Sequence, residues 1–145
     1  MLTIRTILHG TDFSEHSAYA LELASALARD YGARLVLVHV APPPVVFYGE
    51  SALPLEPKEY LQSVREKLEQ IPVGEDIPVE RVLLEGDAVD GILRTAEDKG
   101  ADLIVLGTHG RTGLGRLLLG SVAEQVVRRA NCPVLTVRVP VHLNE

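Results

Sequence analysis

The chain is poor in cysteine and in long apolar runs. Its 145 residues include a single cysteine, Cys132, so no disulfide can form within the chain. We expect Cys132 to be a small packed side chain, the alternative being a reactive thiol. No apolar stretch reaches the roughly 18 residues that a membrane-spanning helix needs. The first residues, MLTIRTILHG, lack the pattern of a secretory leader, so the expected location is the cytoplasm.

Positive charge is scarce as well. The formal net charge is -6, and the only adjacent basic pair is Arg128–Arg129. That is too little for a groove that binds a polyanion, so the composition argues against nonspecific nucleic-acid binding. A domain of this length still buries roughly two thirds of its unfolded surface, which is enough for a stable core.

Several familiar site motifs are missing. A Walker phosphate loop needs Gly-Lys-Ser/Thr, but Gly115 is followed by Arg116 and Leu117. The dinucleotide fingerprint fails because Leu118 stands where its third glycine belongs. There is no Gly-x-Ser-x-Gly, no histidine pair with metal-ligand spacing and no evident acid–base pair of carboxylates. The sequence therefore predicts no catalytic residue.

The chain does contain an alternation of strand and helix patterns. Short β-branched or apolar runs predict strands over residues 3–10, 34–41, 77–86, 101–107 and 132–139. Helical spacing predicts helices over residues 14–32, 57–71, 87–100 and 121–131. Ser14 and Asp87 are expected N-caps, and Gly32 and Gly100 are expected C-terminal stops. We expect most of the first helix to be covered, and the proline-rich segment 42–57 to be a loop.

This alternation indicates an α/β fold, a doubly wound parallel sheet with right-handed crossovers. Five strands and four helices make one small domain over residues 1–145. In such a sheet, ligands bind outside the carboxyl ends of the strands, where the winding direction changes. Functional residues should therefore lie just after the first, second and fourth strands. On the last strand, Val137 and Val139 should point inward and Arg138 outward.

The stretch that follows the fourth strand, VLGTHGRTGLGRLLLGSVAEQV, holds five of the chain's twelve glycines. Gly107 ends the strand and allows a ligand or the backbone to approach closely. Gly110 can take a positive φ and turn N–H groups into an anion nest. Gly120 and Ser121 open the last helix, whose first N–H groups attract anions. The pattern favours a phosphate site built from backbone; the alternative is that these glycines only turn a corner and cap a helix.

Two other strand ends carry weaker signals. Asp12 follows the first strand, where a carboxylate can accept from ribose hydroxyls or help to hold a metal, or simply favour a helix N-terminus. After the second strand, the backbone of Val40 offers groups that an adenine could use. His9 and His39 are expected near the same crevice as packed or solvated side chains. His109, inside the glycine stretch, could touch a phosphate or face solvent.

Taken together, these residues resemble the universal stress protein family, in its ATP-binding branch. The resemblance spans essentially the whole chain, through ILHGTDFSEHSAYAL, LVLVHV and ADLIVLGTHGRTGLGRLLLGSVAEQVVRRANCPVLTVR, with its Gly-x2-Gly-x9-Gly-Ser spacing. It implies a five-stranded sheet in the order 3-2-1-4-5, and ATP, ADP or AMP as ligand, with Mg²⁺ bound through the phosphates. It implies that Asp12 and Gly107 contact the ribose and the Val40 backbone the adenine. For the phosphates it implies Gly110, Gly120, Ser121 and Val122, with Thr11, His109 and Arg111 nearby.

The resemblance also implies a homodimer, often formed through the last strand. The segment Val134 to Val139 fits this, because an apolar edge strand is otherwise an aggregation hazard. Gly10 stands where the family usually has Pro or Ala, which predicts a looser adenine wall. No nucleic-acid or membrane partner is expected, and the protein partner stays open.

Three functions are compatible with these observations. The first is a nucleotide-dependent regulatory protein of the stress response that hydrolyses ATP slowly at most. The second is an ATPase or a phosphoryl- or nucleotidyl-transferase, in which Asp12 or His109 would position the nucleophile. The third is an interaction module that binds no nucleotide. The first is favoured because the phosphate cradle is complete while no base that could activate water is visible.

Overall fold

The computed structural model describes residues 3–43, 45–48, 51–54, 57–108 and 120–140. Its centre is an all-parallel sheet of five strands in the order β5-β2-β1-β6-β7. These strands are β1 (Thr6–Gly10), β2 (Arg34–Ala41), β5 (Val79–Glu85), β6 (Leu103–Gly107) and β7 (Val134–Val137). Counted along this sheet, the order is 3-2-1-4-5. The predicted doubly wound α/β fold and its strand order are confirmed.

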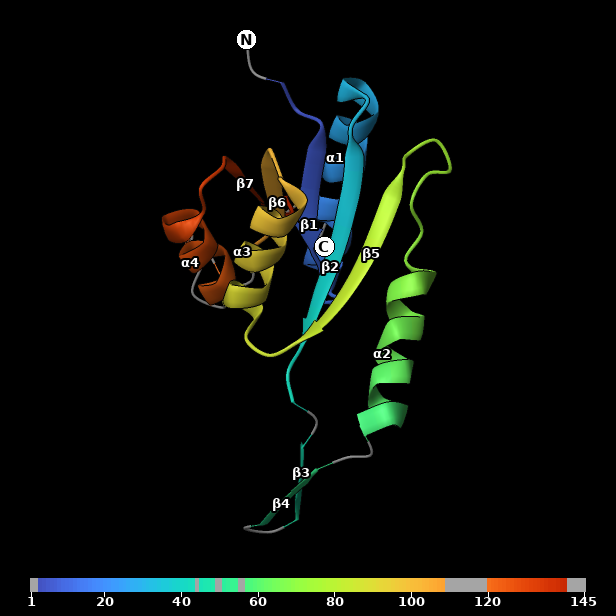
Figure 1. Ribbon diagram of the computed structural model, residues 1–145, viewed down its shortest axis with the longest axis vertical. Helices are drawn as coiled ribbons and strands as arrows, with labels where there is room; N and C mark the ends of the chain where they lie inside the picture. The colour runs from blue at the N-terminus through green and yellow to red at the C-terminus, as the bar shows by residue number, and fades with distance from the viewer. Residues whose placement is uncertain (1–2, 44, 49–50, 55–56, 109–119, 141–145) are drawn as a thin grey trace.

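Helices cover both faces of the sheet (Figure 1). The helices are α1 (Glu15–Tyr31), α2 (Pro57–Gln70), α3 (Ala88–Lys99) and α4 (Ser121–Arg129). In the view of Figure 1, α1 lies behind the sheet, α3 and α4 lie in front of it, and α2 runs beside β5. Within the described ranges, no helix is both long enough and apolar enough to cross a membrane.

The helix ends lie where the sequence places them. Ser14 caps α1 and Asp87 caps α3, each accepting the backbone N–H three residues further on. Gly32 and Gly100 end these helices in the left-handed conformation, both at φ 65°. The predicted caps and stops are confirmed because they depend on local conformational preferences.

The sheet is buried on both faces, as expected for parallel strands between two helical layers. One core cluster lies between the sheet and α1, and the other lies between the sheet and the pair α3 and α4. Along each strand, successive side chains enter opposite clusters, so Ile7 joins the first and Leu8 the second. At the β7 edge, Val137 and Val139 are buried and Arg138 is exposed, as predicted.

The segment predicted as a loop contains a hairpin. β3 (Val45–Tyr48) pairs antiparallel with β4 (Ser51–Pro54) in a separate two-stranded sheet. Figure 1 shows this hairpin extending away from the body of the molecule, beyond the carboxyl end of β2. The loop prediction was wrong for these two strands because it depended on the prolines and on the lack of alternating polarity in this segment. Only a strand packed against a core needs that alternation.

The expectation that most of α1 is covered was also wrong. Leu23 is 37% exposed and Tyr31 is 55% exposed, and Ala18 and Ala26 are exposed too. The helix packs one face on the sheet and leaves the opposite face to solvent. Alanine and leucine are strong helix formers, so they occur on exposed helix faces without indicating burial.

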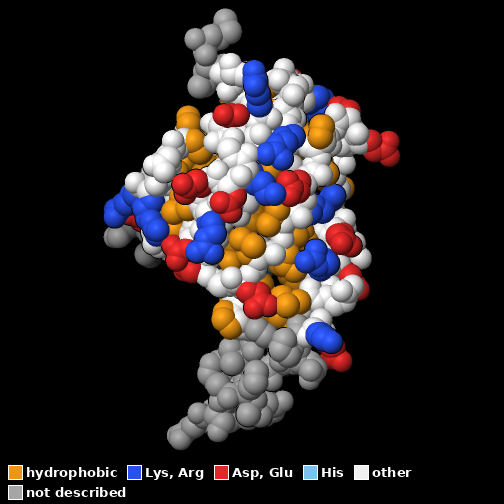
Figure 2. All heavy atoms as spheres, in the orientation of Figure 1, with side chains coloured by type: hydrophobic (Ala, Val, Ile, Leu, Met, Phe, Trp, Pro, Cys, Tyr) orange, Lys and Arg blue, Asp and Glu red, His pale blue; other side chains and the backbone are white. Residues whose placement is uncertain are grey.

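Charged side chains of both signs are intermixed on the face shown in Figure 2. Both arginines of the adjacent basic pair form ion pairs: Arg128 pairs with Glu124 at 2.7 Å and Arg129 with Asp90 at 3.2 Å. Exposed ion pairs of this kind contribute little to stability. They do, however, neutralise the only adjacent pair of arginines in the chain.

Candidate functional site

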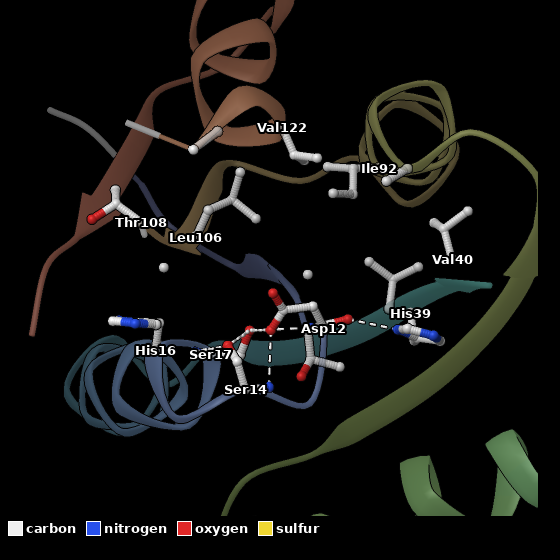
Figure 3. Close-up of a pocket in the computed structure, with 17 residues that line it drawn as sticks. Asp12, Ser14, His16, Ser17, His39, Val40, Ile92, Leu106, Thr108 and Val122 are labelled. Carbon is white, nitrogen blue, oxygen red and sulfur yellow. Dashed lines mark hydrogen bonds between the residues drawn. The ribbon is translucent and has the colours of Figure 1, made fainter. Parts of the chain in front are cut away.

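A cleft opens at the carboxyl edge of the sheet (Figure 3). It lies where β1, β2 and β6 end and where α1, α3 and α4 begin, and it encloses about 650 Å³, counting its open mouth. This is the switch point of the fold, because the chain winds outward in opposite directions on the two sides of β1.

Six of the predicted site residues line this cleft, and they come from four separate parts of the chain: Thr11, Asp12, Val40, Gly107, Gly120 and Val122. Ser121 lies between two of them but is exposed and is not part of the lining. His109, Gly110 and Arg111 fall outside the described residues. The structure thus brings together predicted residues from the carboxyl ends of β1, β2 and β6 and from the start of α4.

Asp12 is held in a tight turn between β1 and α1. Its Oδ1 accepts hydrogen bonds from Ser17 Oγ at 2.6 Å and from the Ser14 N–H at 2.9 Å. The Ser17 hydroxyl in turn accepts from the Asp12 N–H at 3.1 Å. Phe13 sits at φ 66°, a left-handed conformation that is uncommon for an aromatic residue. The carboxylate is therefore fixed in orientation before any ligand arrives.

His39 supports the same turn from β2. Its Nδ1 lies 2.7 Å from the Thr11 carbonyl oxygen, and its ring packs against Phe13 with centroids 4.3 Å apart. The Thr11 N–H donates to the Val38 carbonyl at 2.9 Å, which ties the turn to the sheet. His39 was expected near the crevice as a packed or solvated side chain; it is partly buried, packs on Phe13 and lines the cleft.

Val40 presents its main chain to the cleft. On β2, the Val38 carbonyl accepts from Thr11 on the β1 side, and the Ala41 carbonyl accepts from Gly86 on the β5 side. Successive residues of a strand point their N–H and C=O to opposite sides, so Val40 points both toward the β1 side. The β1–β2 pairing ends at Gly10 and Val38. Beyond that point, the donor and acceptor of Val40 face the cleft.

α4 begins in the cleft without a side-chain cap. Its N-cap is Gly120, at φ -60° and ψ 153°, which has no side chain that could accept an N–H. Gly120, Val122 and Ala123 all line the cleft. The first-turn N–H groups of this helix, with their partial positive charge, are therefore presented to a ligand.

The packing of α1 on β6 requires a glycine at position 107. A Cβ at this position would lie 2.7 Å from the backbone oxygen of His16 and 2.9 Å from its carbonyl carbon. The absence of a side chain thus lets the first turn of α1 pack directly on the end of β6. Of the two expected roles, close approach of a ligand or of the backbone, the structure displays the second.

His9 lies beneath this region, on the α1 side of β1, and is fully buried. Its Nδ1 is 2.9 Å from the Val105 carbonyl oxygen, and its Nε2 has no hydrogen-bond partner among the described residues. Burial lowers the pKa of His9 to about 4, against the smaller opposing effects of the Val105 carbonyl and the Asp12 charge. His9 is therefore a neutral, packed histidine at neutral pH, and it is not part of the cleft lining.

The sequence reasoning missed the contribution of α3. Ala88 and Ile92 line the cleft, and they lie on one face of α3 because they are four residues apart. A Cβ on Gly10 would lie 3.0 Å from Ile92 Cδ1 and 3.1 Å from Leu106 Cδ2. The looser wall predicted from Gly10 is thus not found, because these two side chains occupy the space. The apolar spacing of α3, which follows β5, could have suggested Ile92. The same spacing is, however, typical of every helix residue that packs in a core.

The fold and the position of the cleft define a doubly wound α/β protein with a cleft at the carboxyl edge of the sheet, the place where proteins of this class bind their ligands. Comparison with known families is more specific, since the universal stress protein family matches residues 3–138. The chain belongs to this family.

Individual relatives agree over nearly the full chain. The Thermus aquaticus universal stress protein in the QAH/OAS sulfhydrylase 3′ region is 38% identical over 135 residues, covering 92% of this chain and 98% of the relative. The crystal structure of a universal stress protein family member from Burkholderia pseudomallei is 31% identical with a TM-score of 0.69, covering 92% of this chain and 96% of that one. A universal stress protein crystallised in complex with cAMP is 27% identical with a TM-score of 0.60, covering 94% of this chain and 98% of that one.

Proposed function

We propose that this protein binds an adenine nucleotide, ATP accompanied by Mg²⁺, and acts as a nucleotide-dependent regulatory protein of the stress response. The observation that carries the proposal is the start of α4, without a side-chain cap, in the same cleft as the main-chain groups of Val40 and the Asp12 carboxylate. An adenine nucleotide needs these three features together: a donor and acceptor pair for the base, an acceptor for ribose hydroxyls, and donors for phosphates. The relative crystallised with cAMP supports an adenine nucleotide as the class of ligand.

Each part of the nucleotide has its own residues in this proposal. The Val40 main chain meets the adenine edge, and Asp12 accepts from the ribose beside Gly107. The phosphates lie at the start of α4, held by Gly110, Gly120, Ser121 and Val122, with Thr11, His109 and Arg111 nearby. The described residues contain no cluster of three or more His, Cys, Asp or Glu side chains that could hold a metal. Mg²⁺ would therefore be held through the phosphate oxygens.

The surroundings of Asp12 and His9 favour a regulatory role over a dedicated enzyme. The Oδ1 atom of Asp12 already accepts two hydrogen bonds, from the Ser17 hydroxyl and the Ser14 N–H, so this oxygen is engaged in holding the turn. His9 is buried below the cleft and cannot reach a bound ligand. We expect ATP turnover well below the value of about 10 per second that is typical of enzymes. Turnover at that rate would favour the ATPase or transferase alternative.

The first experiment is a calorimetric titration of nucleotide-stripped protein with Mg-ATP. The wild type should bind with a micromolar dissociation constant, about -8 kcal/mol. Gly120→Val should abolish binding, because a branched side chain would fill the cradle at the start of α4. Gly100→Ala is the matched control, since this glycine ends α3 at the opposite edge of the sheet. No binding by the wild type to ATP, ADP, AMP or cAMP would instead support the interaction module.

We also propose that the protein forms a homodimer through the segment Val134 to Val139. The support is that β7 is an edge strand of the sheet, with apolar residues along it. An edge strand of this kind invites pairing with a second copy. Light scattering should give the mass of a dimer, and Thr136→Pro, which removes a main-chain donor from β7, should shift the protein toward a monomer.

A further inference from the structure

The cleft is closed on the side of α3 by the Ile92 side chain. Ile92 is 5% exposed and lines the cleft together with Val40 and Leu106. In Figure 3, Ile92 and Val122 lie across the cleft from Asp12, with Val40 beside Ile92. The Cδ1 atom of Ile92 comes within 3.0 Å of the position that a Cβ on Gly10 would take. Ile92 therefore stands in space that any other residue at position 10 would claim.

A second glycine sets the position of α3 itself. A Cβ on Gly91 would lie 2.6 Å from Cγ2 of Val40 and 3.5 Å from Cδ1 of Leu84. The missing side chain lets α3 approach β2 closely at this point. Because Ile92 is the next residue, this close contact also fixes how far Ile92 reaches over the end of β1. Gly10 on β1 and Gly91 on α3 thus both determine where the Ile92 side chain lies.

We propose that Ile92 is the specificity-determining residue of the cleft, the aliphatic wall against which the adenine ring packs, and that Gly10 and Gly91 are the positions that admit it. The inference rests on the proposed function and concerns the same cleft. A branched aliphatic side chain gives a flat ring close contact without hydrogen-bonding groups of its own. It holds the ring so that its edge meets the donor and acceptor of Val40.

This arrangement selects adenine over guanine. The hydrogen-bonding edges of the two bases present donor and acceptor in opposite order, whereas the order on the Val40 main chain is fixed by β2. A ring that is free to slide could still form one bond with either base. A ring held by Ile92 meets both groups in one register, so that guanine is left with unpaired polar atoms.

The test measures dissociation constants for Mg-ATP, Mg-GTP and inorganic triphosphate by calorimetry. Wild-type protein should prefer ATP to GTP by at least tenfold. Ile92→Ala should weaken ATP binding by about tenfold, reduce that preference and leave triphosphate binding unchanged. Leu93→Ala is the matched control, since it truncates the next residue of α3 and does not line the cleft. Ile92→Val, with a smaller expected loss, serves if the alanine variant does not fold.

A double variant tests the role of Gly10. Gly10→Ala alone should weaken ATP binding a few-fold, because its Cβ would displace Ile92 Cδ1 and Leu106 Cδ2 by a few tenths of an ångström. In the Ile92→Ala background, the same substitution should restore part of the lost affinity, because the new methyl group enters the vacated space. Strictly additive effects would overturn the pairing of Gly10 with Ile92.

The outcomes separate this inference from the proposed function. If the wild type binds ATP and Ile92→Ala loses no more affinity than Leu93→Ala, the inference is overturned while the proposed function stands. The inference is likewise overturned if the wild type binds ATP and GTP equally well. If the wild type binds triphosphate alone or no nucleotide at all, both the inference and the proposed function fail.

Discussion

The helices α1, α3 and α4 begin beside the cleft, and they do not begin in the same way. α1 and α3 are capped by their own side chains, since Ser14 and Asp87 each accept a first-turn N–H. α4 starts at Gly120, which has no side chain to offer. The backbone at the three N-caps is nevertheless alike, with φ of -83°, -81° and -60° and ψ of 169°, 130° and 153°. The difference lies in the side chain and not in the conformation.

This comparison separates stability from binding at one edge of the fold. A side-chain cap contributes about 1 kcal/mol to a helix relative to alanine, but only a few tenths of a kcal/mol relative to glycine. α4 lacks that contribution although its start, with Gly120, Val122 and Ala123, lines the cleft. The start of α1 lines the cleft as well, but there the Ser14 side chain already accepts a first-turn N–H. An uncapped helix start is useful only where an external acceptor completes it, which is why we assign it to the phosphates.

Giving α4 the cap that the other helices have should produce the largest effect. Gly120→Asp should raise the free energy of unfolding by a few tenths of a kcal/mol, because glycine is itself a tolerable N-cap, and should weaken Mg-ATP binding on the order of 100-fold. The carboxylate would occupy the N–H groups and repel the phosphates. Calorimetry and urea denaturation measure the two effects. Gly120→Asn, an uncharged cap, should keep the stability gain with a smaller loss of affinity; an unchanged affinity in the aspartate variant would contradict the proposed cradle.

Protonation of His9, which is buried beneath the start of α1, should lower the free energy of unfolding. Its folded-state pKa of about 4 lies below the usual value of 6.5, so the unfolded chain takes up the proton first as the pH falls. The stability contribution is complete above about pH 6.5 and is lost between pH 6.5 and 4, by about 3 kcal/mol. Urea denaturation across this range should show the loss. His9→Asn should flatten the dependence, and equal slopes in both proteins would refute this origin.

Adding a side chain at Gly107 should push α1 away from β6. The new Cβ would lie 2.7 Å from a backbone oxygen, which cannot rotate aside as a side chain can. Gly107→Ala should therefore lower the free energy of unfolding by about 1–3 kcal/mol, the usual range for overpacking. Thermal unfolding followed by circular dichroism measures the change. An unchanged midpoint would show that α1 moves at no cost.

Removing a cap that the chain does possess should have the smallest effect and should leave binding alone. Asp87→Ala should lower the free energy of unfolding by about 1 kcal/mol, because α3 loses its N-terminal acceptor. Asp87→Asn, which can still accept the N–H, should lose much less. The dissociation constant for Mg-ATP should stay at the wild-type value in both variants, and a marked loss of affinity would show that capped helix starts also serve the cleft.

Local features made much of this fold predictable. Strand 34–41 was predicted with the bounds that β2 has, and Ser14, Gly32, Asp87 and Gly100 were predicted as the ends of two helices. A buried parallel strand needs a continuous apolar run, and a helix end needs a cap within a few residues of chain. Both requirements are met by neighbours in the sequence, and both are therefore visible there.

Part of the candidate site was predictable for a related reason. Once strands and helices alternate, the topology places every strand end at the same edge of the sheet. Asp12, Val40 and Gly107 could thus be assigned to one cleft although they are far apart in the chain. The hairpin of β3 and β4 could not be predicted because its segment lacks the alternating polarity that indicates a strand. The exposed face of α1 could not be predicted because alanine and leucine also occur on exposed helix faces.

The sequence by itself determined the alternating elements, their caps and the edge at which the site lies, since each depends on residues that are close in the chain or on the order of the elements. Only the tertiary structure decided that Ile92 occupies the space beside Gly10, that Gly107 serves the packing of α1, and that His9 is neutral. These are contacts of a few ångströms between elements that are distant in sequence. Whether such a contact stabilises the fold or is a clash depends on which atoms meet there, and the packing of the whole domain decides which atoms these are.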